Sequence, residues 1–464
     1  MTKVHLIGIC GTAMATLAAM LRDVGYDVRG SDEHVYPPMS DFLAARGIPY
    51  LEGFAPDDIA ADTDLVVIGN AVSRGNPQVE AVLDRGLRYR SLPEMVRETW
   101  LWDHRSVVVA GTHGKTTTTS LTAWCLADGG RDPSFLVGGV AANFDSSYRL
   151  GAGPEFVIEG DEYDTAFFDK SAKCLKYLPD IAVVGNLEFD HVDIYPDLET
   201  IRTTFKRFVR LIPRGGLLLL GADSPATRGL GDEALCTVET FGLTPGADWC
   251  AQTVTTAPEG TTFGVRYRGE PVQEVRTTLV GEFNVRNVLA AFAVARTVGL
   301  ESDTVARAIE RFVGVRRRLE VRGEVRGVRV YDDFAHHPTA VRETLAGLRA
   351  TFPRRRLWAV FEPRSATACR RVFQDAFVSA FDDADETIIG QVYRSALPDA
   401  ERLSESELVA GIRHAGGNAR HVPDVTDIVR IVTDEATAGD VVVVMSNGAF
   451  GGIHARLLEA LADG

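Results

Sequence analysis

The residues best placed to do chemistry lie in a glycine-rich turn that follows an apolar run at 107–110. The turn reads Gly111-Thr112-His113-Gly114-Lys115-Thr116-Thr117, and apolar residues at helical spacing come next. Strand, turn, lysine, hydroxyls and helix together predict a phosphate-binding loop. Backbone N–H groups face the phosphates, Lys115 reaches the β- and γ-phosphates, and the Thr116 hydroxyl can ligate Mg²⁺. The alternative is an ordinary glycine-bounded turn that carries a lysine by chance. The chain uses far more arginine than lysine, so a lysine at this one position favours the phosphate-binding loop.

Acidic side chains follow two further apolar runs. Residues 156–158 lead into Glu159 and the acidic run 159–164, and residues 181–184 lead into a stretch that ends in Asp190 and His191. Parallel strands present their carboxyl ends at one edge of a sheet, so these groups should lie beside Lys115. Carboxylate oxygens and phosphate are typical Mg²⁺ ligands. We therefore expect Glu159, Thr116 and His191 at a metal site. The alternatives are a solvated acidic loop for Glu159 and a core or capping role for His191.

The N-terminal segment resembles a nucleotide-binding strand–turn–helix–strand unit. An apolar run at 3–9 meets a glycine turn, and a second strand at 26–29 precedes Gly30-Ser31-Asp32. Glycines allow a diphosphate to approach the backbone, and the acid can bind ribose hydroxyls. Cys10 and Met14 stand where a dinucleotide fingerprint has glycine, so a turn needed only for packing is the alternative. The candidate ligand-binding residues of this segment, including the turn after a strand at 64–68, are Gly11, Thr12, Ala13, Met14, Ser31, Asp32, Asn70, Ala71 and Ser73.

A second α/β sheet is expected in the C-terminal third. Apolar runs at 329–331, 357–361, 387–389 and 441–444 are separated by helix-like segments. Polar residues gather at their ends: Asp333, His336, Arg364, Ser365 and Asn447. Because a guanidinium can hold a carboxylate with two parallel hydrogen bonds, Arg364 is a candidate for binding a carboxylate ligand.

Length and charge narrow the class of protein. A chain of 464 residues is long enough for about three domains. The net charge of −15 argues against a nucleic-acid or anionic-membrane partner. Six scattered cysteines without metal-ligand spacing suit a reducing cytoplasm, and no apolar run is long enough to span a bilayer. We expect three α/β domains: Rossmann-like at 1–104, phosphate-loop at 105–313 and Rossmann-like at 314–464.

Taken together, these stretches resemble the Mur ligase family of peptidoglycan-building amide ligases over essentially the whole chain. The resemblance implies ATP and Mg²⁺ as cofactors, a UDP-sugar in the N-terminal domain, and the phosphate loop at 111–117. It implies that Glu159 and His191 bind metal, and that Asn284 and Asn287 contact the adenine and the ATP. It also implies an interdomain role for Arg318, and for Asp333 and His336 a role in positioning either the ATP or the attacking amine. The catalytic set it implies is Lys115, Glu159, His191, Arg318, Asp333 and His336.

Within the family, two branches act on UDP-N-acetylmuramate, one adding L-alanine and the other reattaching a salvaged tripeptide. The stretch 159–170, Glu362-Pro363-Arg364-Ser365 and the stretch 445–454 resemble the salvage branch, although Ala366 replaces its usual Asn. Phe205 falls where several members carry a carbamoylated lysine, with Lys206 beside it. The reaction implied is ATP-dependent amide formation between UDP-N-acetylmuramate and L-alanyl-γ-D-glutamyl-meso-diaminopimelate. The alternatives are L-alanine addition, a nucleotide-regulated sensor and, more remotely, an NAD-dependent oxidoreductase; the oligomeric state is left open.

Overall fold

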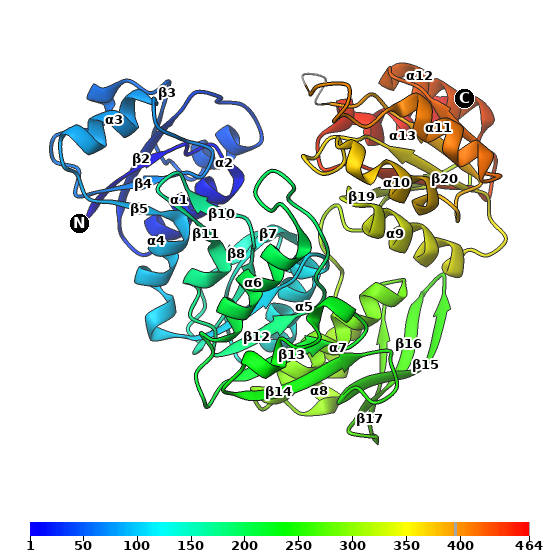
Figure 1. Ribbon diagram of the computed structural model, residues 1–464, viewed down its shortest axis with the longest axis horizontal. Helices are drawn as coiled ribbons and strands as arrows, with labels where there is room; N and C mark the ends of the chain where they lie inside the picture. Colours follow the sequence, from blue (N-terminus) through cyan, green and yellow to red (C-terminus); the bar gives the residue numbers. More distant parts are fainter. Residues whose placement is uncertain (394–396, 464) are drawn as a thin grey trace. The chain divides into compact units, whose positions relative to one another are not determined.

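The computed structural model describes residues 1–393 and 397–463, which form two compact units. The first comprises Met1–Leu187, Glu199–Phe241 and Ala293–Leu300, and the second comprises Glu188–Leu198, Gly242–Phe292 and Glu301–Gly464. Each is an assembly of α/β layers, as the sequence predicts (Figure 1). In the described residues, no helix is long and apolar enough to cross a membrane.

The first unit begins with a five-stranded parallel sheet in the order β3-β2-β1-β4-β5, the blue part of Figure 1. Its strands are β1 (Lys3–Ile7), β2 (Asp27–Asp32), β3 (Tyr50–Glu52), β4 (Leu65–Ile68) and β5 (Tyr89–Ser91). Its helices are α1 (Thr12–Asp23), α2 (Met39–Ala45), α3 (Pro77–Asp84) and α4 (Leu92–Thr99). The predicted strand–turn–helix–strand unit is therefore present, with α1 starting directly after the glycine turn.

A second sheet in this unit centres on β6 (Arg105–Ala110), which lies between β12 (Ile181–Val184) and β9 (Glu155–Gly160). The three strands are parallel and in register at their carboxyl ends, where Ala110 pairs with both Val184 and Gly160. This register brings the turns that follow the strands to one edge, as expected for a ligand site. Helix α5 begins at Lys115, directly after the first of these turns. The remaining elements are α5 (Lys115–Asp128), β7 (Ser134–Ala141), β8 (Ser146–Arg149), α6 (Leu198–Val209), β13 (Leu217–Gly221) and β14 (Thr237–Gly242).

A short antiparallel hairpin between β9 and β12 packs against the N-terminal sheet of the first unit. It consists of β10 (Asp164–Ala166) and β11 (Asp169–Ala172), and the short helix η3 (Lys173–Lys176) follows it. At its tip, Phe167 and Phe168 pack against the apolar core of the N-terminal sheet, with the Phe168 ring centroid 4.9 Å from that of Tyr89. Burial of two aromatic rings holds the hairpin against the N-terminal sheet.

The second unit contains three consecutive antiparallel strands, β15 to β17, and a six-stranded sheet in the order β18-β19-β23-β20-β21-β22. The strands are β15 (Trp249–Ala257), β16 (Gly260–Tyr267), β17 (Glu270–Thr277), β18 (Glu320–Val325), β19 (Val328–Asp333), β20 (Leu357–Phe361), β21 (Glu386–Ile389), β22 (Ala419–His421) and β23 (Val441–Met445). The helices are α8 (Ser302–Glu310), α9 (Pro338–Thr351), α10 (Gln374–Ala380), α11 (Glu405–His414), α12 (Val425–Glu435) and α13 (Ile453–Asp463). All four predicted C-terminal strands are present, and apolar clusters fill both faces of their sheet.

One helix begins earlier than its apolar spacing indicates. We expect it to run from 287 to 298, but α7 spans Glu282–Thr297. Gly281, at φ 90°, stands before its first turn and allows the chain to enter the helix there. Asn284 and Asn287 therefore lie within the helix, three residues apart on one face.

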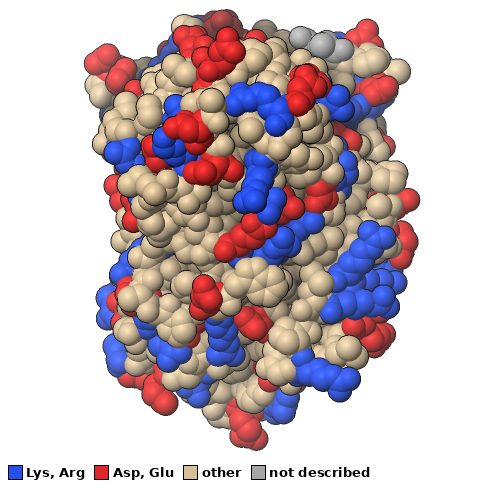
Figure 2. Space-filling view, turned by 90° about the vertical axis from the view of Figure 1, so that its left-hand side faces the viewer, with Lys and Arg blue, Asp and Glu red and all other residues tan. Residues whose placement is uncertain are grey.

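Charged side chains of both signs are interspersed over the face shown in Figure 2, without a broad area of one sign. Neither this pattern nor the net charge of −15 indicates a polyanion-binding surface on that face.

Candidate active site

The turn after β6 has the backbone of a phosphate-binding loop. Gly111 adopts φ 119° and Gly114 adopts φ 81°, both in the region that favours glycine. A Cβ atom on Gly111 would lie 2.8 Å from the carbonyl oxygen of Asn186, so this position also excludes a side chain sterically. Asn186 braces the loop: its carbonyl accepts the N–H of Thr112 at 3.0 Å and its side-chain oxygen accepts the N–H of His113 at 2.8 Å.

Lys115 is held in the loop by three acceptors. Its Nζ atom donates to the carbonyls of Gly111 at 2.6 Å and Thr112 at 3.1 Å, and to Glu162 Oε2 at 2.8 Å. Burial alone lowers the pKa of Lys115, but the nearby carboxylates outweigh it, and the pKa is raised above its ordinary value. The lysine is therefore a fixed positive charge. Glu162 was not among the predicted site residues; its only signal in the sequence is that it belongs to the acidic run 159–164.

Glu159 and Thr116 meet as the sequence predicts. The Thr116 hydroxyl donates to Glu159 Oε1 at 3.0 Å, and the N–H of Gly138 donates to Glu159 Oε2 at 2.8 Å. Thr117 is buried in the first turn of α5. A hydroxyl and a carboxylate beside a phosphate loop are hard oxygen donors, so these two residues fit Mg²⁺. His191 belongs to the second unit, and its metal role stays a prediction.

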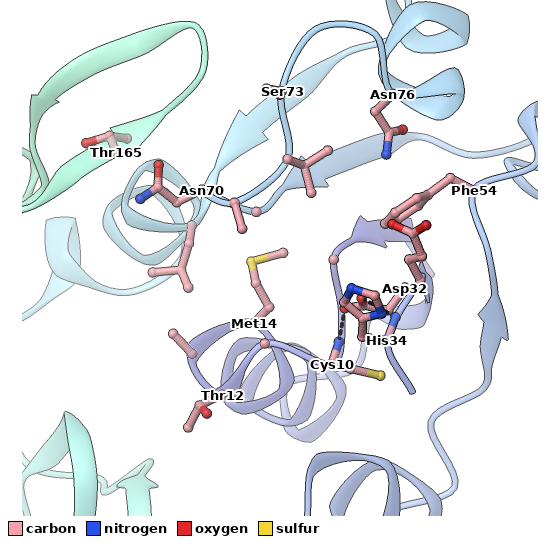
Figure 3. Close-up of a pocket in the computed structure, with 18 of the residues that line it drawn as sticks. Cys10, Thr12, Met14, Asp32, His34, Phe54, Asn70, Ser73, Asn76 and Thr165 are labelled. Atoms are coloured by element: carbon pink, nitrogen blue, oxygen red, sulfur yellow. Dashed lines mark hydrogen bonds between the residues drawn. The ribbon is translucent and has the colours of Figure 1, made fainter. Parts of the chain in front are cut away.

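A cavity of about 710 Å³ lies at the carboxyl edge of the N-terminal sheet. Its wall includes most of the predicted residues of this segment and several that the sequence analysis missed (Figure 3): Gly8, Cys10, Gly11, Thr12, Ala13, Met14, Asp32, Glu33, His34, Tyr36, Phe54, Gly69, Asn70, Ala71, Val72, Ser73, Asn76, Leu92, Thr165 and Lys173. Thr165 and Lys173 come from the hairpin and η3, which adjacency in sequence could not reveal.

Asp32 shapes the glycine turn at this cavity. One carboxylate oxygen accepts the N–H of Cys10 at 2.8 Å, and the other accepts the N–H of His34 at 3.2 Å. Helix α1 starts at Thr12, and Gly11 before it supplies no side-chain cap, so the amides of the first turn remain available to an anion. Ser31 lies beneath the turn: it is fully buried, and its hydroxyl hydrogen-bonds His5 and Gln78.

In the second unit, the two asparagines predicted to contact ATP are linked. Asn287 Nδ2 donates to Asn284 Oδ1 at 3.1 Å, and Asn284 Nδ2 donates to the carbonyl of Val280 at 2.8 Å. The first turn of α7 therefore presents a fixed pair of amides. Whether they contact adenine stays a prediction.

Asp333 and Arg318 are neighbours at the end of β19. Asp333 accepts the N–H groups of Leu319 at 2.7 Å and Ala335 at 2.8 Å. Burial raises the pKa of Asp333, and the positive charge of Arg318 opposes that shift. The Arg318 guanidinium lies over the Phe334 ring at 4.9 Å. Asp333 therefore positions the loop that carries Arg318.

The two predicted histidines, His191 and His336, also lie in the second unit. His191 adopts φ 51°, a conformation rare outside glycine, and its N–H donates to Asp190 at 2.7 Å. Burial raises the pKa of Asp190, but the charges of His191, His336 and His337 and a hydrogen bond from Thr367 lower it overall, below its usual range. His336 hydrogen-bonds the carbonyl of Phe334 through Nδ1 at 2.9 Å.

Arg364 lies at the end of β20 with its guanidinium 3.8 Å from the centre of the Tyr393 ring. It is 3.6 Å from Glu362, and its side chain passes close over Gly448. Asn447, beside that glycine, has a buried side-chain oxygen that accepts no hydrogen bond within the described residues. Ser365 uses its hydroxyl to accept the N–H of Ala368 at 2.9 Å. Arg364 and Asn447 thus retain polar groups for a ligand, whereas Ser365 caps the following turn.

Comparison with known proteins agrees with this arrangement. Three family models match: the Mur ligase family catalytic domain at residues 3–100, the Mur ligase middle domain at 109–295, and the Mur ligase glutamate ligase domain at 317–448. The chain is 42% identical over 464 residues to the UDP-N-acetylmuramate–L-alanyl-γ-D-glutamyl-meso-2,6-diaminoheptandioate ligase of Escherichia coli K12, covering 99% of this chain and 98% of that protein. It is 33% identical to the UDP-N-acetylmuramate–L-alanine ligase of Syntrophus aciditrophicus, covering 99% of this chain and 94% of that protein.

A solved structure gives the same result for the fold. The crystal structure of a murein peptide ligase from Psychrobacter arcticus 273-4 matches with a TM-score of 0.73 and 36% identity, covering 100% of this chain and 99% of that one. Full-length identity of this size, with three consecutive family domains and an intact phosphate loop, identifies the chain as a member of the Mur ligase family.

Proposed function

We propose that this protein joins L-alanyl-γ-D-glutamyl-meso-diaminopimelate to UDP-N-acetylmuramate in an ATP-dependent reaction that forms ADP and phosphate. The observation that carries the proposal is that one compact unit holds both a phosphate loop with a charged Lys115 and a large cavity with a free helix N-terminus. The 42% identity to the Escherichia coli tripeptide ligase over the full length supports the choice of substrates. We place the UDP-sugar in residues 1–104, the ATP in 105–313 and the peptide in 314–464.

The reaction needs charge neutralisation and positioning more than covalent chemistry from the protein. An oxygen of the lactyl carboxylate attacks the γ-phosphorus of ATP, the bond to the β-phosphate oxygen breaks, and ADP leaves. The α-amine of the peptide then attacks the resulting acyl phosphate, phosphate departs, and the amine loses a proton. Lys115 holds the β- and γ-phosphates, and the amides of 112–115 contact them.

Mg²⁺ fits the pair formed by Thr116 and Glu159, which supply a hydroxyl and a carboxylate oxygen. When bound there, the ion would offset the negative charge of the phosphates. Glu159 is aimed by the N–H of Gly138, which fixes one of its oxygens and leaves the other toward Thr116. We propose that His191 contributes to a second metal position.

The alanine-adding reaction is the competing assignment within the family. Identity is 42% to the tripeptide ligase and 33% to the alanine ligase, which favours the tripeptide. The decisive experiment measures ADP release with UDP-N-acetylmuramate and either tripeptide or L-alanine at equal concentrations. Tripeptide-dependent release supports the proposal, and release driven by L-alanine alone would assign the protein to the other branch.

We further propose that the protein works in the cytoplasm, where ATP and nucleotide sugars are present. All six cysteines are free, as a reducing compartment requires.

A further inference from the structure

The cavity at the carboxyl edge of the N-terminal sheet is lined by one positively charged side chain, Lys173, to which the glycine turn and Asp32 assign no function. Within the described parts of the chain, Lys173 is the only lysine or arginine among the residues lining this cavity, which also include Asp32 and Glu33. A UDP-sugar with a lactyl group carries negative charge on its diphosphate and on its carboxylate. The open N-terminus of α1 serves the diphosphate, so the lysine is available for the carboxylate.

The position of Lys173 in the cavity supports assigning the diphosphate to α1 and the carboxylate to the lysine. Figure 3 shows Asp32, His34 and Phe54 on one side of the cavity, and Thr165 near Asn70 on the other. Lys173 belongs to the Thr165 side, because its N–H bonds the carbonyl of Tyr163 at 3.1 Å, beside the β10–β11 pairing. The nucleoside and the lactyl group are at opposite ends of such a ligand, so the side away from Asp32 suits the lactyl group.

A chain of contacts then connects Lys173 to the phosphate loop. Its Nζ atom lies 2.6 Å from Asp161 Oδ2, and the neighbouring residue Glu162 lies 2.8 Å from Lys115 Nζ. Asp161 and Glu162 are consecutive residues, and the negative charges of both raise the pKa of Lys115, so the backbone keeps the two ion pairs near one another. A carboxylate bound at Lys173 would be close to the loop that presents the γ-phosphate.

We propose that Lys173 binds the lactyl carboxylate of the sugar nucleotide and places it for attack on ATP. The inference rests on the proposed function and adds a substrate-positioning residue to it. An ammonium group has three donors, and Asp161 accepts one of them, which leaves donors for an incoming carboxylate. The Lys173 side chain is 20% exposed, so a ligand in the cavity can reach it.

The test compares two ligands that differ only in the lactyl group, UDP-N-acetylmuramate and UDP-N-acetylglucosamine, by calorimetry without ATP. Lys173→Met should weaken binding of the first about 10- to 100-fold, the loss expected for one charge-assisted hydrogen bond, and leave the second unchanged. Lys173→Arg should restore most of the affinity for UDP-N-acetylmuramate. If Lys173→Met does not fold, Lys173→Gln takes its place in the same comparison.

Lys176 supplies a matched control on the same short helix. Its side chain is also 20% exposed, and its Nζ atom also lies 2.6 Å from an aspartate, Asp169, but it does not line the cavity. Lys176→Met should bind both ligands like the wild type. Equal weakening of both ligands in Lys173→Met, no weakening of either, or the same loss in Lys176→Met would each overturn the proposal.

The ADP-release assay separates a failure of the proposed function from a failure of the proposed role of Lys173. A wild-type protein that releases no ADP with UDP-N-acetylmuramate and tripeptide contradicts the proposed function itself. Full wild-type ligation together with wild-type UDP-N-acetylmuramate affinity in Lys173→Met contradicts only the role of Lys173.

Discussion

The ammonium nitrogen of Lys115 lies 2.8 Å from a carboxylate oxygen of Glu162, and both side chains are almost completely shielded from solvent. The same ammonium also donates to two carbonyl groups of its own loop. Phosphates that bind the loop must therefore compete with three acceptors that are already in place. Glu162 keeps Lys115 charged and holds its ammonium group against the loop. Glu162 is therefore a positioning residue for the phosphate loop.

Replacing Lys115 tests both roles of this pair. Lys115→Met should abolish ADP release, because the phosphates lose their lysine. It should also lower the free energy of unfolding by about 3–5 kcal/mol, since it leaves the Glu162 carboxylate buried without its lysine. Adding Glu162→Gln should recover part of the stability and none of the activity. Urea unfolding and an ADP-release assay separate the two effects; wild-type turnover in Lys115→Met would refute the phosphate loop.

Lys206→Met is the control for that experiment. Lys206 is 35% exposed, and its nearest acid, Glu199, is 3.9 Å away. A surface pair of this kind is worth about 0–1 kcal/mol, so stability and activity should both stay close to the wild type.

His5 should make the protein less stable in mild acid. The ring is fully buried beneath the N-terminal glycine turn and bonded to Ser31 through Nε2 at 3.1 Å. Burial lowers the pKa of His5 to about 4, from 6.5. The unfolded chain therefore binds a proton first as pH falls through 6.5, and stability declines until the folded pKa is reached. The loss between about pH 7.5 and pH 5 should be on the order of 2 kcal/mol.

Urea unfolding at these two pH values, with His5→Gln beside the wild type, isolates the histidine. The variant should lose less stability on acidification, because glutamine does not titrate. An identical pH dependence in both proteins would show that other groups govern acid stability.

The sequence predicts the strands well because each buried parallel strand is a continuous apolar run bounded by glycine or acid. The runs at 181–184 and 357–361 match β12 and β20 to the residue. It also predicts that Glu159 meets Thr116, since both follow neighbouring strands of one sheet.

Other features depend on contacts that the sequence pattern does not encode. The early start of α7 follows from the backbone at Gly281, and apolar spacing cannot detect it. Glu162 contacts Lys115 because the turns after β9 and β6 meet at one sheet edge, and Lys173 reaches the cavity wall from the short helix after the hairpin. The sequence predicts that Ser31 follows a strand, but Ser31 lies inside β2, where its hydroxyl joins the buried network around His5.

Asp32→Ala should weaken UDP-N-acetylmuramate binding more than ATP binding. The carboxylate accepts the N–H of Cys10 in the glycine turn and the N–H of His34 in the segment after β2, so its loss loosens the cavity wall and removes an acceptor for the nucleoside. We expect a cost of about 1–3 kcal/mol in calorimetry with UDP-N-acetylmuramate. Loss of ATP affinity with unchanged sugar-nucleotide affinity would contradict the assignment of this domain.

Arg364→Lys should raise the KM for tripeptide while leaving those for ATP and UDP-N-acetylmuramate nearly unchanged. A lysine cannot reproduce the planar contact with the Tyr393 ring or a two-point bond to a peptide carboxylate. Arg430→Lys, at an arginine that is 62% exposed on α12, is the control. If the tripeptide KM does not move, either Arg364 does not contact the peptide or the acceptor is another molecule, and an L-alanine assay separates these outcomes.

Gly448→Ala should reproduce that effect without touching the arginine. A Cβ atom at Gly448 would lie 2.1 Å from Arg364 Nε and 2.2 Å from its Cδ, so the guanidinium must leave its place over Tyr393. Arginine is flexible and can move into solvent, so we expect an unchanged fold and a raised tripeptide KM. Because both substitutions remove the same guanidinium contact, combining Gly448→Ala with Arg364→Lys should add little to either. Gly215→Ala, where a Cβ atom meets no atom within 4 Å, controls for loss of glycine; additive effects in the double variant would show that Gly448 and Arg364 act separately.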